Sequence, residues 1–195
     1  MSHKPRKTNR VRLIGGDYRG RLISFPDAKG LRPSGDRIRE TLFNWLQFEI
    51  AGRCCLDLFA GSGVLGFEAL SRGASAVIFC DTQPVVKQSL LGNIQQLQLQ
   101  DRVQVMQQDG IALLATLAPQ SVDLIFVDPP FAENAVCDCL RQIKISSCLS
   151  SNGLVYVEMD KSQSCDFAQL GWQLLKQKIL GQVFAGLLVL EHAKV

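Results

Sequence analysis

The chain has 195 residues, 47% of them apolar and 20% charged, which is typical of a globular domain and excludes a disordered chain. No apolar stretch approaches the roughly 20 residues that cross a bilayer, and the basic start has no secretory signal, so we expect a cytoplasmic protein without membrane contact. The net charge of +3 is uneven, because residues 1–40 hold 11 Lys and Arg against 4 acidic residues. This basic first fifth indicates an arm that faces a polyanion.

The cysteines and histidines exclude two kinds of chemistry. The seven cysteines form no C-x-x-C pair, and the two histidines, His3 and His192, lie near the ends of the chain. A tetrahedral metal site is therefore not expected, and neither is catalysis by an imidazole base. We expect reduced thiols that pack as small apolar side chains.

The first fifty residues predict a hairpin and a helix. Residues 11–26 read as two short strands around a Gly-Asp turn, and Pro26 ends the second strand. A helical pattern then begins at Pro33. Its apolar face contains Ile38, Leu42, Trp45 and Leu46.

From residue 54 onward, strands alternate with helices. The apolar runs that predict strands are 54–60, 75–81, 102–106, 122–128 and 153–159, and helical segments at 64–73, 84–99, 110–117 and 133–145 separate them. This alternation predicts a parallel sheet with helices on both faces. Two consecutive strands, 172–180 and 182–190, follow as an antiparallel addition at an edge, so we expect an α/β fold with a mostly parallel seven-stranded sheet.

A glycine-rich loop follows the first strand of this sheet. The sequence LDLFAGSGVLG (56–66) contains G-x-G-x-x-G, whose glycines let the backbone approach a ligand at a helix N-terminus. Asp81, 20 residues after Gly61, ends the second strand, where a carboxylate can accept both ribose hydroxyls. The pattern predicts a nucleoside-containing cofactor, and these features alone leave a nicotinamide dinucleotide and S-adenosylmethionine open.

Of two further acidic residues at strand ends, Asp57 favours S-adenosylmethionine. Asp57 interrupts an apolar strand directly before the loop, where its carboxylate can order the loop backbone and face a cofactor ammonium. Asp109 ends the third strand, where it can accept from an adenine amine or cap the next helix.

The loop after the fourth strand has the sequence Asp128-Pro129-Pro130-Phe131. In an open α/β sheet this loop lies at the carboxyl edge, beside the cofactor crevice. The Asp128 carboxylate and the Pro129 carbonyl can accept the two hydrogens of an exocyclic amine, and Phe131 can stack on its ring. Such acceptors favour the positive charge that an amine gains as it attacks a sulfonium methyl group.

The segments LDLFAGSGVLGFEALSRGA (56–74) and FVDPPF (126–131) resemble the class I S-adenosylmethionine-dependent methyltransferases that modify exocyclic amines. The segments RLIGGDYRGR (12–21), LRPSGDRIRETLFNWL (31–46) and GQVFAGLLVL (181–190) resemble the RsmD family of 16S rRNA guanine-N2 methyltransferases, and the resemblance spans about 11–191. It implies a Rossmann-like class I methyltransferase fold and transfer of one methyl group from S-adenosylmethionine to a guanine amine. The substrate would be the 16S rRNA in a small ribosomal subunit or its assembly intermediate, and we expect a monomeric enzyme.

The resemblance also assigns residues, and it implies no metal. The target-amine site would comprise Asp128, Pro129, Pro130 and Phe131. The cofactor would be held by Asp57, Phe59, Gly61, Ser62, Gly63, Asp81 and Asp109. The RNA would be contacted by Arg12, Arg19, Arg21, Arg32, Arg37 and Arg39. The chain divides accordingly into a disordered basic tail (1–10), an RNA-contacting hairpin and helix (11–50) and a cofactor-binding domain (51–195).

The sequence departs from the family pattern at two places. Ser34-Gly35 stands where the family often has two threonines, and Asp81 stands where a glutamate is usual. Neither departure touches the target-amine loop.

Four other interpretations each leave part of the sequence unexplained. A methyltransferase acting on adenine N6 or on a protein glutamine more often has Asn at position 128, and it leaves the basic arm without a role. A nicotinamide-dependent dehydrogenase explains the glycine loop but leaves residues 128–131 unused. A nucleic-acid-binding module explains the basic arm but neither loop. A cytosine-C5 enzyme does not fit, because the chain has no Pro-Cys pair for the nucleophile.

Overall fold

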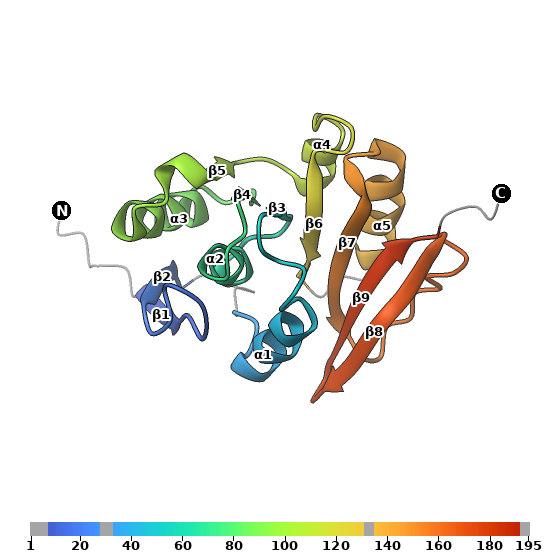
Figure 1. Cartoon of the computed structure of the whole chain (residues 1–195), viewed down its shortest axis with the longest axis horizontal. Helices are drawn as coiled ribbons and strands as arrows, with labels where there is room; N and C mark the ends of the chain where they lie inside the picture. Colours follow the sequence, from blue (N-terminus) through green and yellow to red (C-terminus); the bar gives the residue numbers. More distant parts are fainter. Residues whose placement is uncertain (1–7, 28–32, 131–134, 192–195) are drawn as a thin grey trace.

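The computed structural model describes residues 8–27, 33–130 and 135–191, which form a seven-stranded sheet and a separate hairpin (Figure 1). The strand order in the large sheet is β5-β4-β3-β6-β7-β9-β8. These strands are β3 (Cys54–Asp57), β4 (Ala76–Cys80), β5 (Val103–Met106), β6 (Val122–Val127), β7 (Leu149–Asp160), β8 (Trp172–Leu180) and β9 (Val183–Leu190). Neighbouring strands from β5 to β7 are parallel, as predicted.

The order of the C-terminal strands in the sheet differs from their order in the chain. β9 inserts between β7 and β8 and is antiparallel to both, so β8 forms the edge. Burial explains the order, because the middle of β9 is buried while β8 exposes Lys176 and Lys178. Lysines on an edge strand also discourage further strand pairing.

Helices cover both faces of the sheet (Figure 1). The helices are α1 (Asp36–Trp45), α2 (Val64–Ser71), α3 (Pro84–Leu97), α4 (Gly110–Leu114) and α5 (Ala135–Ser146), with a short 3-10 helix at Gln100–Arg102. Alternate residues of β6 enter two cores: Phe126 packs in the core shared with α1, α2 and α3, and Ile125 packs in the core shared with α4 and α5. The parallel sheet is thus buried on both sides.

The N-terminal hairpin pairs β1 (Thr8–Arg12) with β2 (Leu22–Pro26). β1 begins at Thr8, so the last three residues of the expected tail are strand, and the rest of that tail lies outside the described residues. The side chain of Asn93 on α3 bonds both backbone groups of Ser24, at 2.9 and 2.8 Å. Helix α1 begins at Asp36 rather than Pro33, because Gly35 is still extended (ψ 153°).

The cysteines differ from the expectation that all are reduced. Cys137 of α5 and Cys165 are joined by a disulfide, with their Cα atoms 5.8 Å apart. The described free thiols are those of Cys54, Cys55, Cys80, Cys139 and Cys148. Among the described residues, no group of His, Cys, Asp or Glu could hold a metal ion, and no helix is long and apolar enough to span a membrane.

Candidate active site

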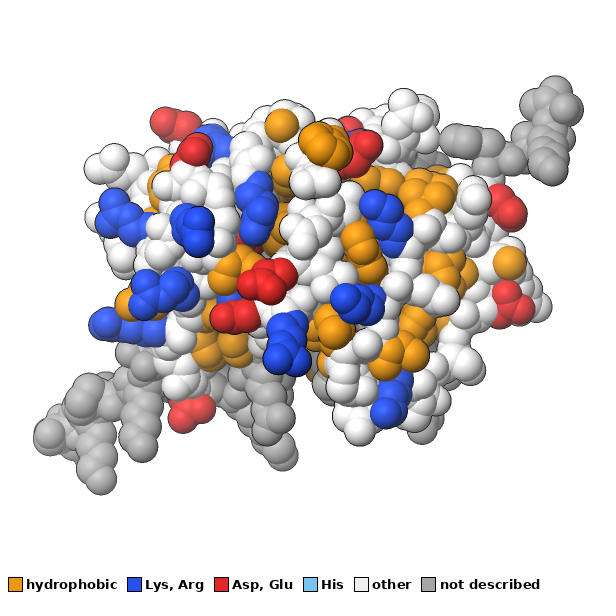
Figure 2. All heavy atoms as spheres, turned by 60° about the horizontal axis from the view of Figure 1, so that its bottom comes forward, with side chains coloured by type: hydrophobic (Ala, Val, Ile, Leu, Met, Phe, Trp, Pro, Cys, Tyr) orange, Lys and Arg blue, Asp and Glu red, His pale blue; other side chains and the backbone are white. Residues whose placement is uncertain are grey.

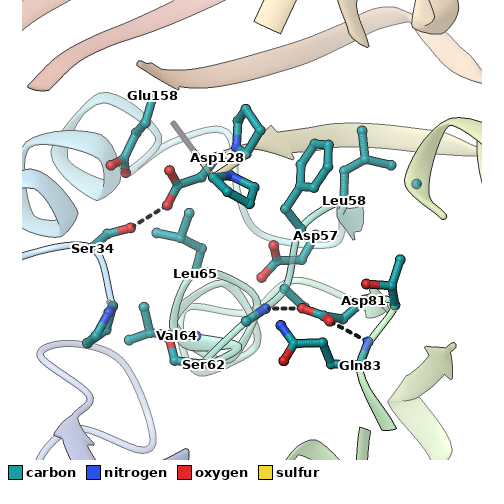
Figure 3. Close-up of a pocket in the computed structure, with 18 of the residues that line it drawn as sticks. Ser34, Asp57, Leu58, Ser62, Val64, Leu65, Asp81, Gln83, Asp128 and Glu158 are labelled. Atoms are coloured by element: carbon teal, nitrogen blue, oxygen red, sulfur yellow. Dashed lines mark hydrogen bonds between the residues drawn. The ribbon is translucent and has the colours of Figure 1, made fainter. Parts of the chain in front are cut away.

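A cleft of about 820 Å³ lies at the carboxyl ends of β3, β4, β5 and β6 (Figure 3). It brings together predicted site residues from four strand ends: Asp57, Phe59, Gly61, Ser62, Asp81, Asp109, Asp128, Pro129 and Pro130. The predicted residue Gly63, the N-cap of α2, is not part of this lining, although its neighbours Ser62 and Val64 are. The predicted residue Phe131 lies outside the described residues.

The glycine-rich loop needs its glycines for conformation and for space. Gly61 and Gly63 have positive φ angles of 49° and 74°, which glycine adopts readily. A Cβ atom on Gly63 would also lie 2.4 Å from Cδ2 of Leu90. A Cβ on Gly66 would lie 2.3 Å from the Phe79 ring, so the third glycine of the motif allows α2 to pack closely on β4.

Asp57 has the structural role that its position in β3 suggested. Its Oδ2 accepts the backbone N–H of Gly66 at 3.3 Å, which ties the first turn of α2 to the strand. The side chain is 3% exposed. Burial, with smaller contributions from Asp128 and Asp81, raises the pKa of Asp57 to about 7, and the Gly66 hydrogen bond opposes this increase.

Asp81 and Asp109 hold the other loops of the cleft. Asp81 accepts the N–H of Gly61 at 3.0 Å and the N–H of Gln83 at 2.8 Å, so its carboxylate joins the loops after β3 and β4. Asp109 caps α4 by accepting the N–H of Ala112 at 3.0 Å, while still lining the cleft. The capping alternative for Asp109 is thus observed, and it leaves the second carboxylate oxygen for a ligand.

Asp128 follows β6 and faces the centre of the cleft (Figure 3). Its Oδ2 accepts a hydrogen bond from the hydroxyl of Ser34, at 3.1 Å, so the segment before α1 helps to build the site. Burial raises the pKa of Asp128 to about 6, against the opposing effect of the Ser34 hydrogen bond. The carboxylate is therefore ionised at neutral pH and can accept an amine hydrogen.

Glu158 of β7 also lines the cleft and was not among the predicted site residues. The side chain is 3% exposed and accepts the hydroxyl of Tyr156 at 2.9 Å. Burial first, and then Asp128, raises the pKa of Glu158 to about 8. The sequence signal for Glu158 is an acidic residue in the apolar run GLVYVEM (153–159), and Asp57 interrupts its own apolar strand in the same way.

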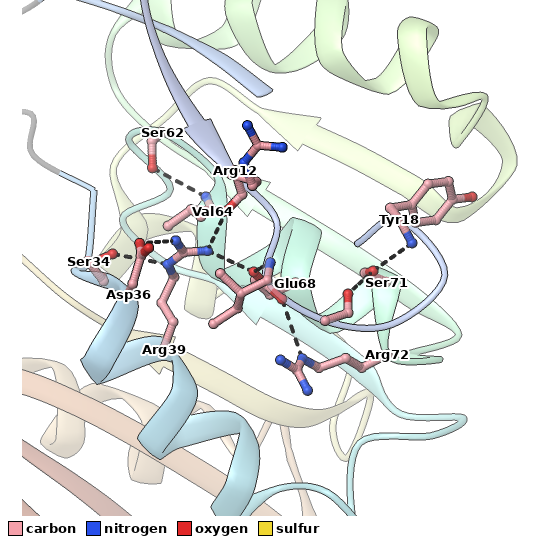
Figure 4. A network of polar contacts seen from close by, with 12 residues as sticks. Arg12, Tyr18, Ser34, Asp36, Arg39, Ser62, Val64, Glu68, Ser71 and Arg72 are labelled. Carbon is pink, nitrogen blue, oxygen red and sulfur yellow. Dashed lines mark hydrogen bonds and ion pairs between the residues drawn. The ribbon is translucent and has the colours of Figure 1, made fainter. Parts of the chain in front are cut away.

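The predicted RNA-contacting arginines do not all reach the surface. Arg12, Arg19, Arg21 and Arg37 are exposed, and Arg32 lies outside the described residues. Figure 2 shows basic side chains on the face to which the hairpin and α1 contribute. The prediction for Arg39 is wrong, because its guanidinium is fully buried between Glu68, at 2.7 Å, and Asp36, at 2.6 Å (Figure 4).

The sheet order, the glycine-rich loop after the central strand β3 and the acidic residues at the following strand ends define the fold of the class I S-adenosylmethionine-dependent methyltransferases. The fold is shared with SMU.776, a candidate methyltransferase solved in complex with SAH (TM-score 0.69, 17% identity, 96% of this chain and 57% of that one).

Residues 11–188 match the family described as Conserved hypothetical protein 95, the RsmD family, and the chain belongs to this family. The ribosomal RNA small subunit methyltransferase D of Haemophilus influenzae is 40% identical over 181 residues, covering 92% of this chain and 93% of the relative. The solved structure of yhhF from Escherichia coli, a candidate methyltransferase, is 34% identical, with a TM-score of 0.85 over 94% of this chain and 99% of that one. These matches do not fit the dehydrogenase interpretation or that of a binding module without catalysis.

Proposed function

We propose that the protein transfers a methyl group from S-adenosylmethionine to the N2 amine of a guanine in small-subunit ribosomal RNA. The observation that carries this proposal is the position of Asp128 and Pro129, which line the same cleft as the glycine-rich loop and Asp81. The name of the Haemophilus influenzae relative supports the ribosomal substrate. The resemblance to the RsmD family supports the choice of the guanine amine.

The cofactor supplies a methyl group on a sulfonium sulfur, and one half of the cleft fits it. Asp81 offers its carboxylate to the ribose hydroxyls, held in place by the N–H groups of two loops. Asp57 lies beneath the loop, where it favours a positively charged group, and Asp109 can accept from an adenine amine. The N-terminus of α2, which begins after Gly63, adds the positive end of a helix dipole that favours a carboxylate.

Asp128 and Pro129 act on the amine. Their carboxylate and carbonyl oxygens accept its two hydrogens, which directs the nitrogen lone pair toward the methyl group. Positive charge grows on the nitrogen during transfer, and the ionised Asp128 stabilises it in a cleft of low dielectric constant. The methylated ammonium is a strong acid, so it then gives its proton to Asp128 or to water.

The exposed arginines of the hairpin, Arg12, Arg19 and Arg21, together with Arg37 of α1, contact RNA phosphates. The hairpin, α1 and the cleft lie in one folded unit, because Leu13, Ile23 and Leu42 share a core with α2. We propose that the enzyme acts as a cytoplasmic monomer on assembled small-subunit particles.

Replacement of Asp128 tests this proposal. Asp128→Ala deletes one of two acceptors that stabilise charge appearing during transfer, and we expect a rate lower by about 10²–10³. Asp128→Asn keeps an acceptor oxygen, so its transfer rate falls less than that of Asp128→Ala. Cofactor affinity changes little in either variant, since the damage is confined to the transition state.

The measurement is single-turnover transfer from labelled S-adenosylmethionine to small-subunit particles that lack the modification. Asp101→Asn, on the exposed 3-10 helix, is the matched control and retains the wild-type rate. Transfer by Asp128→Ala at the wild-type rate would show that this loop is not the catalytic site.

A further inference from the structure

The cleft continues past Asp128, beyond the residues assigned to the cofactor. This far half is lined by Ser34, which precedes α1, by Glu158 of β7 and by Val183 of β9. In Figure 3, Glu158 lies on the side of Asp128 opposite to Asp81. A base whose amine is held at Asp128 therefore has Glu158 as a neighbour on the side away from the residues assigned to the cofactor.

Glu158 and Asp128 are linked by Ser34. The Ser34 hydroxyl donates to Oδ2 of Asp128 at 3.1 Å, and it also lies within hydrogen-bonding reach of the Glu158 carboxyl group. Tyr156 donates its hydroxyl to Oε1 of Glu158 at 2.9 Å. Because Oε1 is already an acceptor, a proton on Glu158 belongs on Oε2.

The surroundings of Glu158 keep it protonated at neutral pH. The groups that face it are Tyr156 on its own strand, Ser34 before α1, Asp128 after β6 and Asp57 at the end of β3. The residue opposite it on β9 is the uncharged Ala185. Burial first, and then the charges of Asp128 and Asp57, raise the pKa of Glu158 to about 8, while the hydrogen bonds of Tyr156 and Ser34 oppose this increase. This value lies above that of Asp128 at about 6, so the pair holds one proton between these values.

A carboxylate and a carboxylic acid offer different hydrogen bonds. Asp128 only accepts, whereas protonated Glu158 donates one O–H and keeps an acceptor oxygen. The Watson–Crick edge of guanine presents the N2 amine, the ring N1–H and the carbonyl O6 in order. Adenine presents an amine, a ring nitrogen without hydrogen and a C–H group.

We infer that Glu158 selects guanine by accepting its N1–H and donating to its O6, while Asp128 holds the N2 amine. This inference rests on the proposed function. Enzymes that draw a base out of its stack commonly recognise it through this edge. Glu158 is thus a specificity-determining residue, distinct from the cofactor site and from the acceptor of the reacting amine.

A substrate analogue tests the inference without any mutation. The substrate is a small-subunit particle reconstituted with rRNA carrying either guanine or 2-aminopurine at the target position. 2-Aminopurine keeps the N2 amine that Asp128 holds but lacks both N1–H and O6. We expect wild-type kcat/KM to be about 10- to 100-fold lower for 2-aminopurine.

Two variants then assign the preference to Glu158. Glu158→Ala loses most of the preference for guanine over 2-aminopurine, because its kcat/KM for guanine falls while that for 2-aminopurine changes little. Glu158→Gln restores most of the preference for guanine, since an amide also supplies an N–H donor beside an acceptor oxygen. Between pH 7 and 9 the preference of the wild type declines as Glu158 loses its proton, and that of Glu158→Gln does not.

Melting temperatures confirm that the variants are folded, and exposed Glu191→Gln serves as the control with unchanged preference. Equal transfer to guanine and 2-aminopurine by the wild type would overturn the inference, as would a full preference in Glu158→Ala. Both results leave the proposed function intact. Failure of the wild type to methylate guanine would instead refute the proposed function and the inference with it.

Discussion

Asp81 illustrates how one side chain can serve the fold and the ligand together. It accepts backbone N–H groups from Gly61 and Gln83, one in each loop that borders the cofactor half of the cleft. Each carboxylate oxygen has a second lone-pair direction, so both can still accept a ribose hydroxyl. The aspartate in place of the family's usual glutamate therefore still supports the loops and can bind the ribose.

Asp81→Ala is expected to weaken S-adenosylmethionine binding by about 1.5–3 kcal/mol, because it removes a charged bidentate contact. Part of this loss comes from the freed N–H of Gly61. Isothermal titration calorimetry with the cofactor measures it, with Asp101→Ala as a control at an exposed position. An unchanged dissociation constant for Asp81→Ala would contradict the assignment of the ribose site.

Arg39 and Glu68 connect three elements in the core. The Arg39 guanidinium donates to Glu68 of α2 and to the backbone oxygen of Arg12 on β1, and Glu68 also accepts the N–H of Ile14 at 2.6 Å (Figure 4). Both side chains are fully buried. The pair therefore fixes the hairpin and α1 against the helix that follows the glycine-rich loop.

Glu68→Ala leaves the buried Arg39 charge without its main partner, and we expect the free energy of unfolding to fall by about 3–5 kcal/mol. The double variant Arg39→Met with Glu68→Leu removes both charges and loses less stability than Glu68→Ala alone. Urea denaturation measures the free energy of unfolding of both variants. The control Asp138→Ala breaks the surface pair with Arg141 and changes stability by less than about 1 kcal/mol. A similarly small effect of Glu68→Ala would show that the network does not hold the hairpin.

The hairpin also carries the predicted RNA contacts. Replacing exposed Arg19 and Arg21 by Ala is expected to weaken binding to small-subunit RNA and to flatten its salt dependence by roughly one logarithmic unit per lost phosphate contact. Filter binding at several salt concentrations measures the slope. Arg141→Ala with Lys144→Ala on α5 removes the same charge from a helix on the other face of the sheet. If the hairpin variant keeps the wild-type slope, the arm does not bind phosphates.

Local patterns predicted the elements better than their partners. The alternation of apolar runs located the strands and helices of the sheet to within a few residues, because each depends on its own periodicity. The sequence could not show that Arg39 is buried, since its partner Glu68 lies 29 residues away and an arginine is normally exposed. The placement of β9 inside the sheet likewise depends on long-range pairing.

At the scale of the whole molecule, the carboxyl edge of the sheet explains why most of the cleft was predictable. Every parallel strand ends at this edge, so acidic residues after β3, β4, β5 and β6 had to converge. Glu158 was not predicted, because it lies within the long strand β7 and not at a strand end that leads into a glycine-rich or proline-rich loop. The result is a cleft in which Asp57, Asp128 and Glu158 are crowded together.

This crowding predicts that the protein becomes less stable as the pH rises. The pKa values of Asp57, Asp128 and Glu158 in the folded state are about 7, 6 and 8, above the value of roughly 4 in an unfolded chain. Between pH 4 and pH 8 the folded state thus binds more protons than the unfolded state. The stabilisation from these carboxyls is fully present below pH 4 and is lost as the pH rises through their folded pKa values.

We therefore expect the free energy of unfolding of the cofactor-free protein to decrease from pH 5 to pH 8.5, by up to about 1.4 kcal/mol per unit of pKa difference at each carboxyl group. Urea denaturation followed by the fluorescence of Trp45 and Trp172 measures this decrease. Glu158→Gln removes the group with the highest pKa of the three, so it reduces the slope and makes the protein more stable than the wild type at pH 8.5. Glu191→Gln, at an exposed position, leaves the slope unchanged. A wild-type stability that stays constant or increases over this range would contradict the assignment of raised pKa values to the cleft.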